Sequence, residues 1–334
     1  MKKLFFLFCG VLFFAMTASF YAAFEVTRYA YAPGRQNAEL QTVVVAPGQG
    51  FSATTHRLAE GGIIENPLHF RIFARINGYD KQIKAGEYEV SASLSPARIL
   101  EMLISGKVVL HRLTVPEGLT YHQIAGLAAG AGFFPAETFI RAAEDATLTR
   151  ELGVTGTSFE GYLFPDTYYF PRGTTARDMI IAMANRFKNI FTPEWQERAA
   201  ELKMSLHEVT TLASIIEKET GASVERPLIS SVFHNRLKRG MRLETDPTVI
   251  YGITEFNGNI TREHLQADTP YNTYRITGLP PGPIANPGKE ALYAALYPEE
   301  TDYLFFVSKN NGTHQFSTSM AAHDEAVRKY QLGK

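Results

Sequence analysis

A long uncharged apolar segment near the N-terminus constrains this chain more than any other feature. Residues 4–24 contain no charged side chain, and Lys2 and Lys3 come directly before them. A helix of about 20 apolar residues spans the hydrocarbon core of a bilayer, and flanking lysines favour its cytoplasmic side. The sequence therefore predicts a cytoplasmic stub and a single membrane anchor over residues 1–24, with the remaining chain on the extracytoplasmic side.

A cleaved signal peptide is the alternative interpretation of the same segment. Residues 17–19 and 21–23 contain small side chains that resemble a cleavage site. However, the apolar core of a signal peptide has about 7–15 residues, and this segment is longer, which favours a retained anchor. Both interpretations place the chain outside the cytoplasm. A retained anchor predicts a single-pass membrane protein with its main part on the extracytoplasmic side.

Composition narrows the class of protein further. The chain has 334 residues, of which 45% are hydrophobic, so it is long enough for two domains with buried cores. Its formal net charge of −1 supplies no basic excess for phosphate groups, so nucleic acid is not an expected partner. Cys9 is the single cysteine and lies in the apolar segment. The exported part therefore has no disulfide and no thiol nucleophile.

Turn residues and helix caps divide the rest of the chain. We expect a linker over residues 25–40 and a small α+β module over residues 41–110, in which Ser95 caps a helix that ends at Gly106. Residues 111–334 predict a larger mixed α+β domain, so the fold class is α+β. We expect a helix that begins at Pro67, with Leu68, Ile72 and Ile76 on one face. The clearest further expectations are helices over 120–130, 175–190, 205–220, 227–239 and 321–330, and a hairpin joining 303–307 to 313–317.

Several common chemistries are missing from the sequence. There is no Gly-x-Ser-x-Gly segment, and no serine is followed three residues later by lysine. No His-Glu-x-x-His segment, cysteine pair or phosphate-binding glycine loop occurs. We therefore expect no metal and no organic cofactor. Carboxylates, tyrosines and amides remain in quantity, and this inventory suits a carbohydrate ligand.

Four segments stand out by composition and follow one another along the chain. They are Glu-Gly-Tyr-Leu-Phe-Pro-Asp-Thr-Tyr at 160–168, Ile-Glu-Lys-Glu-Thr at 216–220, Thr-Asp-Pro-Thr-Val-Ile-Tyr-Gly at 245–252, and Tyr-Asn-Thr-Tyr at 271–274 with the proline-rich loop 278–288. Together they resemble the endolytic murein transglycosylase (MltG or YceG-like) family, from about residue 40 to the C-terminus. The resemblance implies a LysM-like module at 41–110 and a catalytic domain at 111–334.

The resemblance also implies a reaction. Enzymes of this family are lyases that cleave the β-1,4 bond between N-acetylmuramic acid and N-acetylglucosamine within peptidoglycan strands and leave a 1,6-anhydro end. By resemblance Glu217 is the catalytic residue, first as acid and then as base. Such an acid begins protonated, so we expect an apolar setting, with which Ile215 and Ile216 are compatible. An anchored enzyme would meet new strands beside membrane-bound synthases, which suits trimming or terminating them.

Helical periodicity by itself does not select Glu217. At ~100° per residue, Glu219 projects into the apolar arc of its helix and Glu217 lies at the margin. A carboxylate at the margin can line a groove, whereas Glu219 suits a buried hydrogen bond or salt bridge. The pattern leaves both open, and the resemblance favours Glu217.

Five further residues are candidates for substrate binding. Asp246 precedes a proline, so it is either a turn former or a group that positions Glu217 or sugar hydroxyls. Tyr271, Asn272, Thr273 and Tyr274 offer stacking faces and amide contacts to N-acetyl sugars, but turn packing explains them equally well.

Other residues fit structural roles. Glu160 and Asp166 are expected to pair with arginines such as Arg172 and so hold the aromatic turn. The loop 278–288 is either a wall of the groove or a rigid connector.

Two rival functions stay open: a hydrolytic muramidase in which Asp246 helps Glu217 to activate water, and a scaffold that binds peptidoglycan without cleaving it.

Overall fold

The computed structural model describes residues 2–333. The chain forms two compact units, one of residues 1–111 with 169–173 and the other of residues 112–168 with 174–334. The division passes through strands β3 (Leu110–Thr114) and β4 (Thr167–Pro171), which pair with each other. The inclusion of 169–173 in the first unit was not expected from the sequence.

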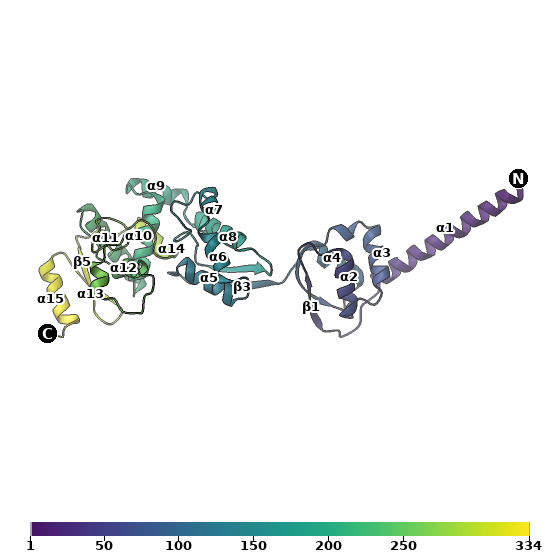
Figure 1. The fold of residues 1–334 in the computed structure, drawn as a ribbon, viewed down its shortest axis with the longest axis horizontal. Coiled ribbons are helices and arrows are strands. Elements are labelled where there is room, and N and C mark those ends of the chain that lie inside the picture. Colours follow the sequence, from purple (N-terminus) through teal and green to yellow (C-terminus); the bar gives the residue numbers. More distant parts are fainter. Residues whose placement is uncertain (1, 334) are drawn as a thin grey trace. The chain divides into compact units, whose positions relative to one another are not determined.

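Helix α1 (Lys2–Tyr31) contains the apolar segment. Among residues 2–333 it is the one helix long and apolar enough to cross a membrane. It continues through residues 25–31, so the prediction of a linker there is wrong. Val26 and Ala30 are buried because this end of α1 packs against α3 (Pro67–Ile76) and α4 (Pro96–Ser105) (Figure 1).

The first unit is a small mixed α+β structure. Strands β1 (Leu40–Val45) and β2 (Gly86–Ser91) are antiparallel and pair in the register Leu40↔Ser91. Helix α4 begins after Ser95, whose side chain caps it, and ends at Gly106 in the left-handed conformation. Both ends agree with the sequence signals. The remaining elements are α2 (Phe51–Glu60) and the short η1 (Tyr79–Lys81).

Helix α3 turns a different face to the core than its aliphatic pattern suggests. Leu68, Ile72 and Ile76 are exposed. The buried positions are instead Phe70, Phe73 and Ala74, which belong to the same core as Tyr88 and Leu103. Contacts with α1 and α2 therefore select the aromatic face of α3 and leave the aliphatic one uncovered.

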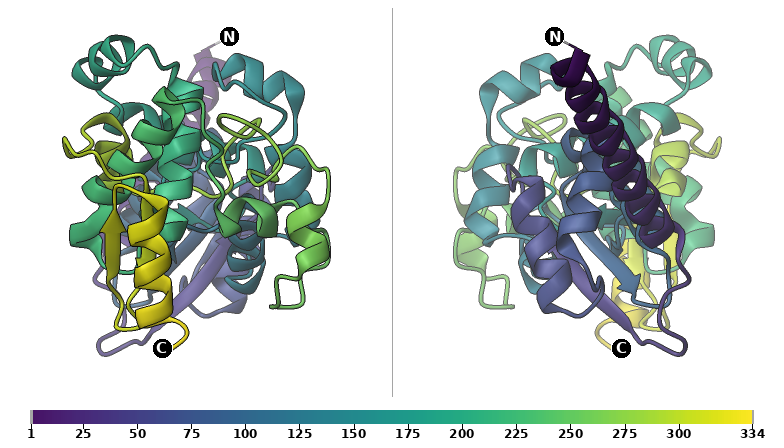
Figure 2. Two further views of the ribbon diagram at one scale, coloured as in Figure 1. Left: turned by 90° about the vertical axis from the view of Figure 1, so that its left-hand side faces the viewer. Right: turned by 90° about the vertical axis from the view of Figure 1, so that its right-hand side faces the viewer.

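The second unit is mainly helical. Its central contact is between α10 (Leu206–Glu219) and α14 (Lys289–Leu296). The hairpin of β5 (Phe305–Ser308) and β6 (His314–Ser317) is antiparallel, as predicted, and α15 (Met320–Tyr330) lies beside it (Figure 2, left). The other elements are α5 (Tyr121–Gly130), α6 (Ala136–Ala143), α7 (Ala146–Glu151), α8 (Ala176–Ile190), α9 (Pro193–Glu201), η2 (Ser223–Glu225), α11 (Arg226–Lys238), α12 (Asp246–Tyr251) and α13 (Arg262–Gln266).

One glycine fixes the aromatic turn after Glu160 against this helical core. Gly161 has φ +86°, which favours glycine. A Cβ atom at this position would lie 2.5 Å from Pro283 and 2.9 Å from Thr210 of α10. The turn and the proline-rich loop therefore approach each other next to α10.

Candidate active site

Glu217 lies in the last turn of α10. Ser205 begins this helix with a capping box in which Glu208 participates, so its start is strongly specified by local sequence. Ile215 and Ile216 are fully buried. The side chain of Glu217 sits at the edge of this buried surface and is 8% exposed.

Both carboxylate oxygens of Glu217 have polar partners. Arg226, the first residue of α11, donates from Nη2 to Oε1 at 3.1 Å, and the backbone N–H of Gly288 donates to Oε2 at 2.9 Å. The C-terminal end of a helix carries partial negative charge, so a carboxylate there is stabilised by a nearby cation. The immediate setting of the Glu217 oxygens is thus polar, unlike the apolar setting expected from the sequence.

Two loops beside Glu217 are hydrogen-bonded to each other. Gly118 N–H donates to Asn286 O at 2.9 Å, and Asn286 N–H donates to Leu119 O at 2.8 Å. Lys218 adds a hydrogen bond from Nζ to Gly118 O at 3.2 Å. The proline-rich loop therefore does more than connect two elements, because its end supplies the Gly288 N–H to Glu217.

Glu117 brings a second carboxylate to the same arginine. Its Oε2 lies 3.7 Å from Arg226 Nη2, and its side chain is 46% exposed. Burial, and next the charge of Glu217, raise the pKa of Glu117. Neither Glu117 nor Arg226 was predicted, although the Pro-Glu-Gly turn at residues 116–118 is a signal that could have drawn attention to the first.

Glu160 is a buried carboxyl that hydrogen-bonds to the same loops. Tyr121 N–H and the Asn286 side chain donate to its Oε1 at 3.2 and 2.9 Å, while its buried Oε2 has no hydrogen-bond partner at normal distance within residues 2–333. Burial raises the pKa of Glu160 to about 8. The Tyr251 hydroxyl lies nearby, and burial and the charge of Glu160 raise its pKa. The prediction that Glu160 pairs with an arginine is wrong.

Asp166, the other acid of the aromatic turn, does pair with an arginine. Its partner is Arg186, whose Nε lies 2.8 Å from Asp166 Oδ2, and not the expected Arg172. The structural role predicted for this acid is thus found with a different partner.

Glu219 has the buried hydrogen bond that periodicity suggested. Thr245 donates to it from Oγ1. Burial raises the pKa of Glu219, and the charge of Asp246 adds to this effect. This contact joins the Thr-Asp-Pro-Thr turn to the end of α10.

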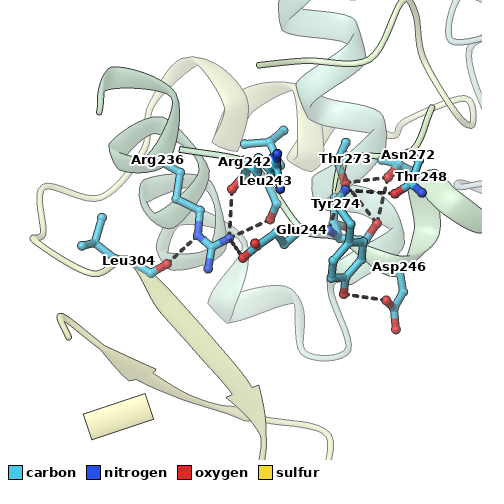
Figure 3. A network of polar contacts seen from close by, with 11 residues as sticks. Arg236, Arg242, Leu243, Glu244, Asp246, Thr248, Asn272, Thr273, Tyr274 and Leu304 are labelled. Atoms are coloured by element: carbon cyan, nitrogen blue, oxygen red, sulfur yellow. Dashed lines mark hydrogen bonds and ion pairs between the residues drawn. The ribbon is translucent and has the colours of Figure 1, made fainter. Parts of the chain in front are cut away.

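The five candidate binding residues separate into two groups (Figure 3). Asn272 and Thr273 are fully buried, and their polar atoms bond within the chain. Asn272 donates to the carbonyls of His264, Leu265 and Ala267, and Thr273 bonds to Thr245 and Thr248. These contacts favour the packing role that the sequence left open for Asn272 and Thr273.

The other three candidates are more accessible. Tyr274 donates from its hydroxyl to Asp246 Oδ1 at 2.8 Å, so Asp246 faces Tyr274 in this structure (Figure 3). The ring of Tyr271 lies 4.9 Å from that of Tyr251. Among residues 2–333 there is no cluster of three or more side chains of the types that hold a metal ion.

Comparison with known proteins assigns the chain to a family. The model of the YceG-like family matches residues 43–329. A protein of Bacillus subtilis named endolytic murein transglycosylase is 34% identical over 87% of this chain and 84% of its own length. A Streptococcus pneumoniae protein of the same name is 30% identical over 88% of this chain, which spans 59% of that longer protein. The chain belongs to the YceG-like family.

A solved structure agrees with this assignment. The crystal structure of a putative YceG-like protein from Listeria monocytogenes is 34% identical, with a TM-score of 0.60. The match covers 86% of this chain and 98% of the Listeria chain. The similarity therefore extends over the fold as well as over the sequence.

Proposed function

We propose that the protein is an endolytic lytic transglycosylase of peptidoglycan, a lyase, with Glu217 as its catalytic residue. One observation carries the proposal: a nearly buried glutamate at the end of α10 is held by Arg226 and Gly288. The curated relatives named endolytic murein transglycosylases supply the reaction class.

The proposed reaction needs one group that gives and then takes a proton. Protonated Glu217 donates to the glycosidic oxygen as the bond from C1 of N-acetylmuramic acid to N-acetylglucosamine breaks. The ionised carboxylate then takes the proton of the C6 hydroxyl as its oxygen bonds to C1. The product is a 1,6-anhydro end, no water is consumed, and Glu217 regains its proton.

Location is part of the proposal. Helix α1 is compatible with a single-pass anchor, which would hold the enzyme at the inner membrane with residues 41–334 on the periplasmic side. There it would trim or terminate strands as membrane-bound synthases make them. We also propose that residues 41–110 form a LysM-like module.

The hydrolytic rival requires a second carboxylate that activates water. The contact of Asp246 is with Tyr274, which leaves Asp246 without a direct link to Glu217. The second carboxylate near Arg226 is Glu117, and we assign it a different role below.

Replacement of Glu217 by Gln tests the proposal. The amide keeps the size of the side chain but has no proton to donate as an acid, so we expect cleavage of purified glycan strands to fall at least about 100-fold. Glu197→Gln on the exposed surface of α9 is the matched control, and strand length analysed by chromatography is the measurement.

Glu219→Gln decides between the two glutamates that periodicity left open. We expect this variant to cleave strands because Glu219 bonds to Thr245 inside the fold. Cleavage by Glu217→Gln at the wild-type rate, with loss of cleavage in Glu219→Gln, would reverse the assignment.

A further inference from the structure

Arg226 holds two carboxylates with one nitrogen. Its Nη2 lies 3.1 Å from Glu217 Oε1 and 3.7 Å from Glu117 Oε2. An arginine usually binds a carboxylate with two parallel N–H groups, and here neither glutamate has that arrangement. Arg226 Nε is also buried and has no hydrogen-bond partner within residues 2–333. The guanidinium is therefore shared between the two glutamates rather than committed to one.

The proposed role of Glu217 creates a conflict at this arginine. Glu217 must be neutral when it acts as an acid and charged when it acts as a base. A guanidinium that is only 14% exposed stabilises the charged form and opposes the neutral one. When Glu217 is neutral, the largely buried Arg226 still needs a counter-ion, and Glu117 is the other carboxylate within ion-pair distance of it.

We infer that Glu117 is a positioning residue that takes over the Arg226 ion pair whenever Glu217 is protonated. In the acid state Arg226 pairs with Glu117, and Glu217 keeps its proton for the glycosidic oxygen. After the proton is donated, Arg226 returns to the newly charged Glu217. Glu117 acts through Arg226 and does not need to touch the substrate, and this inference rests on the proposed function of Glu217.

The surroundings of Glu117 allow this exchange. Its side chain is 46% exposed, and its Oε2 already lies within ion-pair distance of Arg226. Burial raises the pKa of Glu117, and the negative charge of Glu217 raises it further. Protonation of Glu217 removes the second effect and so favours a charged Glu117 when Arg226 needs a partner. The close packing of Gly288, where a Cβ atom would lie 1.9 Å from Glu117 Oε1, keeps this carboxylate beside the loop that binds Glu217.

Two other charged residues, Lys218 and Glu290, lie near the carboxylates of Glu117 and Glu217. Lys218 is adjacent to Glu217 on α10, and its Nζ donates to Gly118 O at 3.2 Å. Glu290, in the first turn of α14, adds negative charge near Glu117 and raises its pKa. Arg226 is the cation that contacts both carboxylates.

The test is the pH profile of strand cleavage by Glu117→Gln in the full chain. Without the second carboxylate, Arg226 stays on Glu217 and favours its charged form. An acid must be protonated to act, so the pH above which cleavage is lost should move down by about one unit. This upper pH limit of activity is called the limb. At pH values below the limb, we expect both kcat and KM to stay near wild type. Glu117→Asp, which keeps the charge, should return the limb toward its wild-type position.

The controls separate this inference from the proposed function. Glu197→Gln should leave the limb in place, and thermal melting should show Glu117→Gln folded as wild type. An unmoved limb in Glu117→Gln, or an equal loss of activity at every pH, would overturn the inference while Glu217→Gln stays inactive. Activity in Glu217→Gln would overturn the proposed function itself.

Discussion

Glu160 is a carboxyl whose nearest partners are hydrogen-bond donors and tyrosines rather than a cation. Burial raises its pKa from 4.5 to about 8, so between these values the folded chain binds more protons than the unfolded one. The stability that Glu160 contributes is therefore complete below pH 4.5 and is lost as the pH rises to about 8. Each unit of this difference corresponds to about 1.4 kcal/mol.

Glu160→Gln should weaken this pH dependence. The amide stays neutral, and its oxygen can still accept from Tyr121 N–H and Asn286. We expect the melting temperature of the variant to fall less than that of wild type between pH 5 and 8.5, measured by differential scanning calorimetry. Glu197→Gln should follow wild type. Parallel curves for wild type and Glu160→Gln would contradict a raised pKa at this site.

The sequence could indicate Glu217 but not its partners. The Ile-Glu-Lys-Glu-Thr segment carries the resemblance, and periodicity could not separate Glu217 from Glu219. Arg226, Glu117 and Gly288 reach Glu217 only through packing of distant parts of the chain. A local pattern holds no information about such contacts.

Residue chemistry alone was also ambiguous for the Tyr-Asn-Thr-Tyr segment. Asn272 has the donors that suit a sugar, but it uses them on backbone carbonyls inside the fold. Burial favours the packing interpretation for Asn272 and Thr273, and burial cannot be read from four polar residues in a loop.

Elements with strong local signals were predicted best. The cap of α4, the range of α10 and the hairpin β5–β6 agree with the structure because capping and turn formation depend on neighbouring residues. The buried face of α3 was not predictable, since α1 and α2 select it. Helices α9 and α12 were not expected, and both begin near a proline.

Helix α1 gives a prediction at the scale of one element. We expect the full chain to remain with membranes after washes with high salt or carbonate and to dissolve only in detergent, because residues 4–24 can bury their apolar side chains in lipid. A chain that lacks residues 2–24 should be soluble, and it keeps Val26 and Ala30 for packing in the first unit. Recovery of soluble mature protein with an N-terminus near residue 24 would contradict a retained anchor.

At the scale of the whole molecule, every residue of the candidate site belongs to the second unit. Arg226, Gly288 and Glu117 come to Glu217 from a helix and two loops of that unit. The sequence predicted a mixed α+β chain with a small module before a larger domain. It did not predict that residues 169–173 belong to the first unit while the residues before and after them belong to the second. A short segment that leaves one unit for the other has no local sequence signal.

The central claim is that Glu217 drives a cleavage in which no water is added. Mass spectrometry of the fragments released from purified sacculi tests it most directly, with wild type and Glu217→Gln treated in parallel. We predict that wild type releases fragments with 1,6-anhydro ends, each lighter by one water than the corresponding hydrolysis product, and that Glu217→Gln releases none. Fragments with the mass of hydrolysis products, or the same anhydro fragments from Glu217→Gln, would contradict the account.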